Sequence, residues 1–390
     1  MKRWMAWLLG CLLLLTACEA PSPQENIPSP PSAPETAFVK AVWIPYMEVE
    51  EWLSSADPRA AIAAGMEDCQ RRGVNTVYFH VRANSDAYYA STVYPLHPSA
   101  ARLSENGCDP LQVAIEEAHA RGMTLHAWVN PYRIGADASR AVTTDVFEAG
   151  GKWYYIPSAA STHETVTAGV RELVENYDID GVQFDDYFYP EGAVPDAAPA
   201  AFEEADYTAY RQSGGHLSVA DRRRAAVNRL VAAVYDICHG REGCVFGISP
   251  AYDLEKNFSE KYADVKTWAA VSGYVDYLCP QLYFGFSHQY APFLTEFERW
   301  DALPRAESVA MYVGLAAYKT GLTSDTYAGA GAAEWSERDD ILARQLQVAK
   351  EAAWDGAALY SHRSIVAEDG RDASIVQAEW EALCAAWNQF

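Results

Sequence analysis

Two adjacent carboxylates, Asp185 and Asp186, stand where a strand-like segment gives way to a loop rich in aromatic residues. Apolar and polar side chains alternate over residues 180–185, as in a strand whose two faces meet different surroundings. A carboxylate at the C-terminal end of a strand is typical of the catalytic end of a (β/α)8 barrel. Carboxyl groups beside aromatic rings suit glycoside hydrolysis, because proton transfer must occur next to a stacked sugar face. We therefore predict that Asp185 is catalytic; an Asp that only orders the loop is the alternative.

Asp186 is the predicted partner of Asp185. Two carboxylates this close raise the pKa of one of them, which suits a general acid. The alternative for Asp186 is a side chain that turns away or pairs with a nearby arginine. Glu48, just beyond the first predicted strand, is a second candidate for the partner, or the solvated start of a loop. The choice between retention and inversion depends on the carboxylate separation, about 5 Å or about 6.5–9.5 Å, which a sequence does not contain.

Polar and aromatic residues recur at the C-terminal ends of the other predicted strands, where any one of them alone could be a packing residue. Alternation places His80 and Arg82 on the same side of one strand. A buried Arg82–Asp86 pair that orders the following loop is an alternative to sugar binding, and the two roles are compatible. We predict that the sugar subsites are lined by His80, Arg82, Asp86, Trp128, Asn130, Tyr132, Arg133, Gln281, Tyr283, Tyr318 and His362.

Eight strand-like segments, each followed by a helix-like segment, position these residues. Strict alternation favours parallel strands covered by helices, and eight units favour closure into a barrel. The predicted strands are 39–46, 75–82, 123–129, 180–185, 244–249, 275–282, 308–315 and 355–361, and the predicted helices are 56–72, 109–122, 163–177, 218–239, 259–273, 290–303, 337–353 and 372–388. We predict an α/β fold with a single (β/α)8 TIM barrel over residues 38–390.

The predicted strand-to-helix loops differ greatly in length. The long ones are 83–108, 130–162, 186–217 and 316–336, whereas the helix-to-strand connections are short. In a barrel the strand-to-helix loops all lie at one end, where active sites are built. The loop 186–217 is rich in Asp and Glu, and it is either a lid or a solvated insertion.

The N-terminus has the features of an export signal. A charged pair, Lys2 and Arg3, precedes an apolar run that is shorter than the ~20 residues needed to span a bilayer. Residues 15–18 resemble a bacterial lipobox, so we predict a signal peptide over 1–17 and lipid attachment at Cys18. An ordinary secretory signal with an incidental cysteine is the alternative. Residues 18–37 are rich in proline and are predicted to form a disordered tether, which gives an extracytoplasmic protein anchored to the cell membrane.

The composition argues against several classes of function. The formal charge of −23 disfavours binding to nucleic acid and to anionic lipid surfaces, and we attribute it to solubility. There is no dinucleotide fingerprint, no P-loop and no Cys/His cluster with metal spacing, so no cofactor and no metal are predicted. The predicted partners are a polysaccharide and the membrane, and the protein is expected to be a monomer. Cys238 and Cys244 flank a short turn and form either a disulfide or buried free thiols.

Several short segments stand in a recognisable order along the chain. They are 41–44 (AVWI), 73–78 (GVNTVY), 86–89 (DAYY), 126–133 (HAWVNPYR), 180–190 (DGVQFDDYFYP), 246–250 (FGISP), 276–283 (DYLCPQLY) and 314–315 (GL). No single motif is decisive, but their order and spacing resemble the glycosyl-hydrolase-like 10 family of bacterial envelope lipoproteins, from about residue 38 to the C-terminus. The resemblance implies a barrel with glycosidase activity, an envelope setting and peptidoglycan glycan strands as a substrate.

A second resemblance, to chitinase-type barrels, fails at the residues that matter. Those enzymes carry D-G-x-D-x-D-W-E-Y-P on their fourth strand, with the Glu as the acid. In an alignment on Asp180 and Gly181, Gln183 replaces the first inner Asp and Tyr187 stands at the position of the acid. The acid must therefore be Asp185, Asp186 or a residue from another strand.

Three functions fit these observations to different degrees. We predict an extracytoplasmic glycoside hydrolase that acts on O-glycosyl bonds of a polysaccharide by two-carboxylate chemistry. The first alternative is a non-catalytic glycan-binding lipoprotein on a barrel scaffold. The second is a metal-dependent deacetylase, which would require ligands that converge on one point, drawn from His80, His126, Asp185 and His362.

Overall fold

The computed structural model describes residues 37–105, 107–195, 197–366 and 370–387. The predicted signal peptide, the lipidation site Cys18 and all of the predicted tether except residue 37 lie outside this part of the chain. None of the helices within it is long and apolar enough to cross a membrane.

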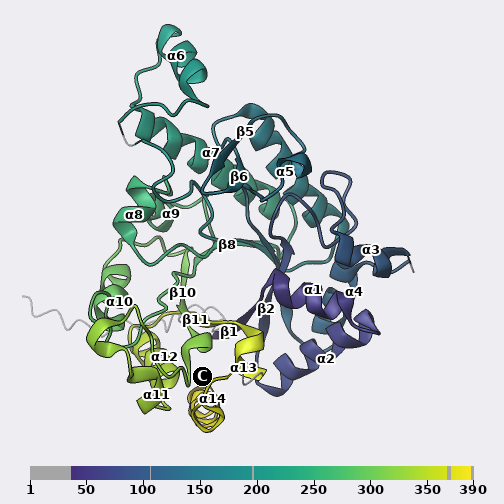
Figure 1. Ribbon diagram of the computed structural model, residues 1–390, viewed down its shortest axis with the longest axis vertical. Helices are drawn as coiled ribbons and strands as arrows, with labels where there is room; N and C mark the ends of the chain where they lie inside the picture. Colours follow the sequence, from purple (N-terminus) through teal and green to yellow (C-terminus); the bar gives the residue numbers. More distant parts are fainter. Residues whose placement is uncertain (1–36, 106, 196, 367–369, 388–390) are drawn as a thin grey trace, which may run out of the picture. The chain divides into compact units, whose positions relative to one another are not determined.

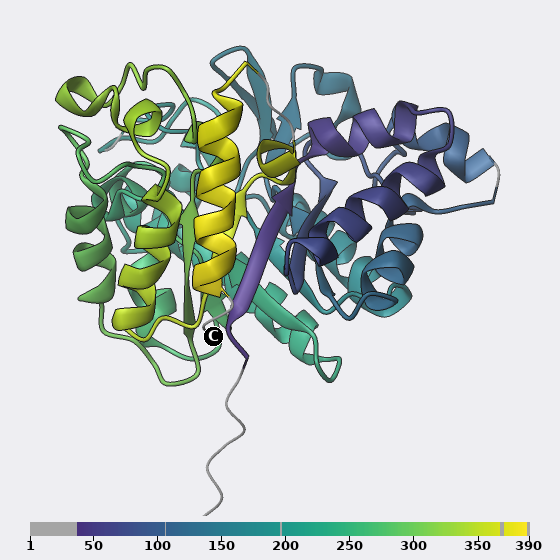
Figure 2. The same cartoon turned by 90° about the horizontal axis from the view of Figure 1, so that it is seen from below.

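A closed barrel of eight parallel strands forms the centre of the fold (Figure 1). Each strand pairs with the next along the chain, and the last strand pairs with the first, from Val39–Gly356 to Trp43–Tyr360 (Figure 2). The predicted fold class and all eight predicted strands are confirmed. The strands are β1 (Val39–Ile44), β2 (Thr76–Arg82), β3 (Thr124–Val129), β7 (Gly181–Phe184), β8 (Val245–Ile248), β9 (Tyr277–Leu278), β10 (Ala310–Leu315) and β11 (Gly356–Tyr360).

The strand β9 is much shorter than the predicted segment 275–282. Pro280 follows it closely and has no backbone N–H to donate to a neighbouring strand, so the regular ladder stops there. Only isolated bridges continue beyond it, from Gln281 to Ala251 and to Gly314. This irregular segment carries Gln281 to the end of the barrel where the strands terminate.

Helices surround the barrel at nearly all of the predicted places. They are α2 (Pro58–Arg71), α4 (Pro110–His119), α5 (Ala160–Asn176), α7 (Val219–His239), α10 (Phe293–Asp301), α12 (Ile341–Glu351) and α14 (Ala373–Trp387). The predicted single helix 259–273 is wrong. The chain there forms two short helices, α8 (Leu254–Ser259) and α9 (Val265–Ala270), because Tyr262 between them adopts a left-handed φ of 53° that no helix continues through.

The long strand-to-helix loops are confirmed, but they contain structure that the sequence pattern did not reveal. A three-stranded antiparallel sheet follows β3, and α6 projects away from the barrel at the top of Figure 1. These added elements are α1 (Tyr46–Ser54), α3 (Pro98–Glu105), β4 (Arg133–Gly135), η1 (Ala138–Arg140), β5 (Val146–Ala149), β6 (Lys152–Tyr155), α6 (Glu204–Gln212), η2 (Ala317–Lys319), η3 (Gly329–Gly331), α11 (Glu334–Glu337) and α13 (His362–Val366).

Two separate apolar layers stabilise the barrel. The large layer lies between the strands and the helices, and it contains outward residues such as Val77 and Phe79 of β2. The small layer fills the interior, where Trp43, Tyr78 and Tyr277 are almost completely buried. Aromatic rings therefore close the barrel from within, and any site must lie above them at the loop-bearing end.

The cysteines in the described part of the chain are free thiols. Cys238 ends α7 and Cys244 precedes β8, and both side chains are buried. A hydrogen bond between the two thiols raises the pKa of Cys238 and lowers that of Cys244 to about 7. Of the two alternatives for this pair, the structure contains the buried free thiols.

Candidate active site

A pocket of about 90 Å³ lies at the C-terminal ends of the barrel strands. Both predicted catalytic carboxylates line it, and six of the barrel strands or the segments directly after them contribute to it. Its lining residues are Trp43, Trp128, Asp185, Asp186, Tyr187, Ser249, Gln281, Tyr283 and Tyr360. A larger cavity, of about 620 Å³, lies between α5 and α7. None of the predicted site residues lines that cavity, so the small pocket is the candidate site.

Asp185 follows β7 directly and lies at the base of this pocket. The residue is 7% exposed, and its Oδ1 accepts hydrogen bonds from the Asp186 backbone N–H (2.7 Å) and from Gln281 Nε2 (2.9 Å). Burial, followed by the negative charge of Asp186, raises the pKa of Asp185 well above its usual range. A carboxyl group that keeps its proton near neutral pH is suited to act as a general acid.

Asp186 has a cationic partner that the sequence did not point to. Its Oδ2 lies 3.0 Å from Nζ of Lys261, which stands in the break between α8 and α9. Burial disfavours the charge of Lys261, but Asp186, and to a smaller extent Glu191, raise its pKa above the usual value. The pocket thus holds one carboxyl group with a raised pKa next to a second one that is paired with a buried amine.

Aromatic rings form the walls of the pocket. Tyr283 and Tyr360 lie with their ring centroids 5.8 Å apart, and Tyr318 contacts both rings edge-on at 6.0 and 6.1 Å. Tyr318 and Tyr187 are each more than a third exposed, so both rings are accessible from solvent. Rings that converge on two carboxyl groups provide stacking faces for a pyranose.

His80 lies directly behind one wall of the pocket. Its ring stacks on Trp128 with a centroid separation of 3.7 Å, and its Nδ1 accepts a hydrogen bond from the Tyr46 backbone N–H. Burial, with a smaller effect from Arg133 and Arg82, lowers the pKa of His80 well below its usual range. The neutral imidazole therefore supports Trp128 and does not itself line the pocket.

The predicted orientation of Arg82 is wrong. The pairing of β2 with β3 shifts register between His80 and Arg82, so simple alternation fails at this point. Arg82 Nη2 donates to the carbonyl oxygens of Asn130 and Pro131, and its guanidinium lies 4.5 Å from the ring centroid of Tyr94. Tyr94 in turn reaches α5, so Arg82 faces the helix layer and not the pocket.

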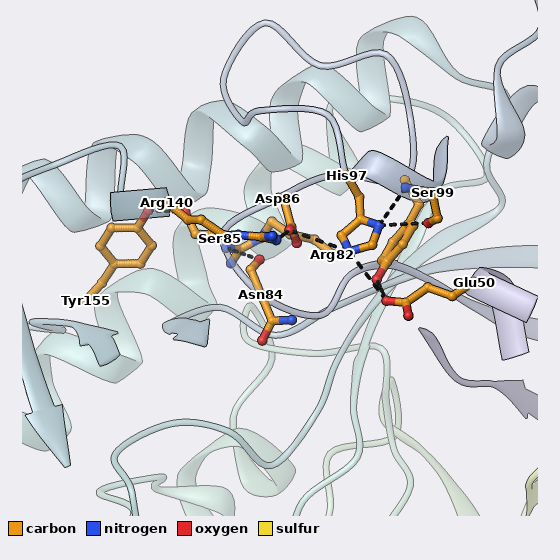
Figure 3. Close-up of polar contacts among 10 residues, drawn as sticks. Glu50, Arg82, Asn84, Ser85, Asp86, His97, Ser99, Arg140 and Tyr155 are labelled. Carbon is orange, nitrogen blue, oxygen red and sulfur yellow. Dashed lines mark hydrogen bonds and ion pairs between the residues drawn. The ribbon is translucent and has the colours of Figure 1, made fainter. Parts of the chain in front are cut away.

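Asp86 is also outside the pocket lining, in a polar cluster within the loop after β2 (Figure 3). It is 1% exposed and pairs with Arg140, not with Arg82 as the alternative proposed. His97 Nε2 stands between two acids, 3.9 Å from Asp86 Oδ2 and 3.5 Å from Glu50 Oε1. These contacts tie the loop to η1 and α1, which is a structural role.

The three predicted residues after β3 take separate positions. Asn130 is fully buried and donates to the Ala83 carbonyl oxygen, and Tyr132 packs edge-on against Phe188 in the interior. Neither lines the pocket. The side chain of Arg133 does reach the edge of the pocket, because the guanidinium lies 5.2 Å from the ring centroid of Tyr187, which lines the pocket.

Glu48 and His362 contact each other and not the pocket. Glu48 belongs to the helix α1, which the sequence pattern did not predict, and its Oε1 shares a hydrogen bond with His362 Nδ1. Glu48 Oε2 also accepts from the Arg363 backbone N–H, and His362 Nε2 lies 3.5 Å from Asp68 Oδ2. The structure therefore places Glu48 in the join between the first and last units of the barrel, away from Asp185.

Several pocket residues were not among the predicted site residues. Tyr360 ends β11, and Tyr187 follows the two carboxylates, so strand-end position was a usable signal for both. Trp43 lies within β1, and its Nε1 donates to Gln183 Oε1 at 2.7 Å across the interior. No local sequence pattern could identify Lys261 as the partner of Asp186, because the two residues are 75 positions apart in the chain.

The residues considered for a metal centre do not converge. His126 shares a hydrogen bond with Tyr277, His362 binds Glu48, and His80 stacks on Trp128. In the part of the chain that the structure describes, no group of three or more His, Cys, Asp or Glu side chains is placed to hold a metal ion.

Comparisons with known proteins identify the family and support the fold. Residues 38–328 match the family described as glycosyl hydrolase-like 10. Glycosyl hydrolase DigH of Escherichia coli K12 is 28% identical over 375 residues, covering 82% of this chain and 84% of the relative. Glycosyl hydrolase YngK of Bacillus subtilis is 28% identical over 364 residues, covering 83% of this chain and 69% of the relative.

Two solved structures share the fold at low sequence identity. The glycoside hydrolase domain of PgaB from Bordetella bronchiseptica has a TM-score of 0.58 at 11% identity and covers 89% of this chain and 99% of its own. The catalytic domain of a β-amylase from Paenibacillus polymyxa also has a TM-score of 0.58 at 11% identity, with coverage of 90% and 99%. Because the family match extends over most of the chain, this protein belongs to the glycosyl hydrolase-like 10 family.

Proposed function

We propose that this protein is an extracytoplasmic, lipid-anchored glycoside hydrolase that cleaves a polysaccharide, with peptidoglycan glycan strands as its substrate. The observation that carries the proposal is the pair of unlike carboxyl groups in one aromatic pocket. Asp185 is buried and its pKa is raised, first by burial and then by Asp186, whereas Asp186 is paired with Lys261. Glycoside hydrolysis requires one carboxyl group as an acid and one as a base or nucleophile.

In this mechanism Asp185 donates its proton to the glycosidic oxygen while the bond from that oxygen to the anomeric carbon breaks. The carboxylate of Asp186 stabilises the developing positive charge on the sugar ring. Water then forms a bond to the anomeric carbon, and the proton that this water loses restores the carboxyl group of Asp185 to its protonated form. Gln281 fixes the Asp185 side chain by its hydrogen bond to Oδ1, and it is held in turn by donating to the Ser249 carbonyl oxygen. The aromatic walls orient the ring by stacking.

The substrate class and the location rest on supporting observations of a different kind. The location is supported by the resemblance of residues 1–18 to an export and lipidation signal, since envelope polysaccharides are found outside the cytoplasm. Relatives in Escherichia coli and Bacillus subtilis carry the name glycosyl hydrolase. The walls of the pocket are aromatic, which suits stacking against a sugar ring of a longer chain.

The test is the release of reducing ends from a panel of polysaccharides that includes intact and peptide-stripped peptidoglycan. We expect Asp185→Asn to lower release by about 10²-fold or more, because general acid catalysis contributes on this order. Circular dichroism and the thermal midpoint are expected to show a folded variant, since Asn can still accept the two hydrogen bonds of Asp185 Oδ1.

Asp253→Asn is the matched control. Asp253 follows β8 at the same end of the barrel, but its side chain caps α8 by accepting from Glu255 and Lys256 N–H groups, which Asn also does. This control is expected to release sugar at the parental rate. Equal release by Asp185→Asn and the parent would remove Asp185 from the mechanism. Binding of a glycan by the parent without release from any member of the panel would support the glycan-binding alternative instead.

A further inference from the structure

Arg133 is a cation without an acidic partner in a strongly acidic protein. The chain has 53 Asp and Glu residues against 30 Lys and Arg. Among the described residues, no carboxylate and no hydrogen-bond acceptor contacts the guanidinium of Arg133, and its Nε is buried without a partner. A buried N–H group left unpaired destabilises the folded state, so such a group calls for an explanation.

The location of Arg133 points to a ligand. Arg133 lies on β4, in the loop sheet that follows β3, where it faces Tyr154 of β6 in register. Its guanidinium stands over the ring of Tyr187, with 5.2 Å to the centroid, and Tyr187 lines the pocket. The antiparallel pairing of β4 with β6 holds the arginine backbone, so the side chain is presented to the pocket from a fixed element.

The other charges around the pocket are already balanced. Burial and the neighbouring Asp186 raise the pKa of Asp185, which favours its neutral form, and the charges of Asp186 and Lys261 offset each other at 3.0 Å. Arg133 therefore adds an uncompensated positive charge at the edge of the pocket. The hydroxyl groups of a neutral sugar can accept hydrogen bonds from a guanidinium, but only an anionic group on the substrate would also offset its charge.

We propose that Arg133 binds a carboxylate carried by the substrate sugar, and that this contact selects glycans with acidic residues. The proposal rests on the proposed function, because it takes the pocket to be a sugar site. The planar guanidinium offers parallel N–H donors that match a carboxylate, while Tyr187 beneath it stacks on the pyranose. The carboxylate can belong to a lactyl ether on an amino sugar or to C6 of a uronic acid, and the experiment separates the two.

The experiment measures binding to the full chain in the Asp185→Asn background by isothermal titration calorimetry, so that no substrate is consumed. The probes are an amino-sugar oligosaccharide with free lactyl carboxylates, the same oligosaccharide with these groups converted to carboxamides, and a uronate oligosaccharide. We expect at least one acidic probe to bind roughly 10- to 100-fold more tightly than the carboxamide form. Arg133→Met is expected to remove this preference, and Arg133→Lys to retain part of it.

Arg344→Met is the matched control. Arg344 also stands over an aromatic ring, 4.3 Å from the centroid of Phe286, but it lies on α12 and outside the pocket. It is expected to keep the full preference for the acidic probe. An unchanged preference in Arg133→Met, or no preference in the Asp185→Asn background, would overturn the proposal.

The two proposals fail in distinguishable ways. If the parent releases no sugar from any polysaccharide but the carboxylate preference depends on Arg133, the proposed hydrolase activity is wrong and the proposed carboxylate site is supported. If the parent releases sugar, and Arg133→Met in the Asp185→Asn background binds the carboxylate and carboxamide probes as tightly as Asp185→Asn alone does, the proposed carboxylate site is wrong and the proposed hydrolase activity is supported.

Discussion

Asp185 is buried among aromatic side chains with another carboxylate beside it, and both surroundings disfavour its charged form. In the folded protein its pKa is raised above the unfolded value of about 3.8, so the folded state binds the proton more tightly. The stabilisation that this proton provides is complete below pH 3.8 and is lost as the pH rises through the folded pKa. The same burial that keeps Asp185 a proton donor therefore lowers the free energy of unfolding at higher pH.

Asp185→Asn is accordingly expected to be more stable than the parent at pH 8. The gain arises because the amide never has to carry a buried charge, and it grows by on the order of 1 kcal/mol per pH unit above pH 3.8 until the folded pKa is passed. Urea unfolding at pH 5 and pH 8 measures the difference. A variant that is less stable than the parent by the same amount at both pH values would show that Asp185 is not held neutral in the fold.

The strand β8 carries a glycine at a position that faces the barrel interior, where an aromatic ring fills the space of a side chain. Its inward residues are Val245 and Gly247, whereas Phe246 and Ile248 face the helices. A Cβ atom on Gly247 would stand 2.0 Å from the Tyr277 ring. The ring cannot move aside, because it stacks on Tyr312 at 4.7 Å and its hydroxyl shares a hydrogen bond with His126 Nδ1.

Gly247→Ala is therefore expected to lower the free energy of unfolding by about 1–3 kcal/mol, the usual effect of overpacking a core. Chemical denaturation measures it. In a Tyr277→Leu background the same change is expected to have little effect, because the opposing ring is gone. Gly240→Ala, at the end of α7 and outside the barrel interior, serves as the control and is expected to stay within about 0.5 kcal/mol of the parent. Equal losses for Gly247→Ala in both backgrounds would contradict this account.

The whole barrel depends on a join between its first and last units. β1 pairs with β11, and next to this pairing His362 binds Glu48 from α1 and approaches Asp68 from α2. Glu48 and His362 are 314 residues apart and both almost fully buried. Burial works to lower the pKa of His362, but hydrogen bonds to Asp68, Cys69 and Glu48 raise it well above the usual value.

Because the folded pKa of His362 is raised, its stabilisation is complete below the usual value of about 6.5 and is lost as the pH rises through the folded pKa. We expect Glu48→Gln to lower the free energy of unfolding by about 3–5 kcal/mol at pH 6, as removal of one partner of a buried ion pair does. The loss is expected to shrink above the folded pKa of His362. Urea unfolding over a range of pH values measures both effects.

The control for this join is Glu116→Gln. Glu116 pairs with Arg59 between α2 and α4, and both side chains are nearly half exposed. An exposed pair is worth at most about 1 kcal/mol, and its removal is expected to show little dependence on pH near neutrality. A Glu48→Gln variant that behaves like this control would mean that the Glu48–His362 contact does not hold the barrel closed.

The sequence by itself determined the eight strands, their order, most of the helices and the end of the barrel that carries the long loops. These features follow from side-chain alternation and helical spacing, which are local and can be counted along the chain. The adjacency of Asp185 and Asp186 was equally visible. Gln281, Tyr283 and Trp128 were identified by strand-end position, and the structure places all three in the pocket lining.

Only the tertiary structure decided which of the polar residues meet. A register shift in the pairing of β2 with β3 directs Arg82 toward the helices. The break between α8 and α9 places Lys261 next to Asp186. The partners in the site are far apart along the chain, as with Asp185 and Gln281, 96 residues apart. Such contacts depend on closure of the barrel and on the paths of irregular loops, and no local periodicity records either of them.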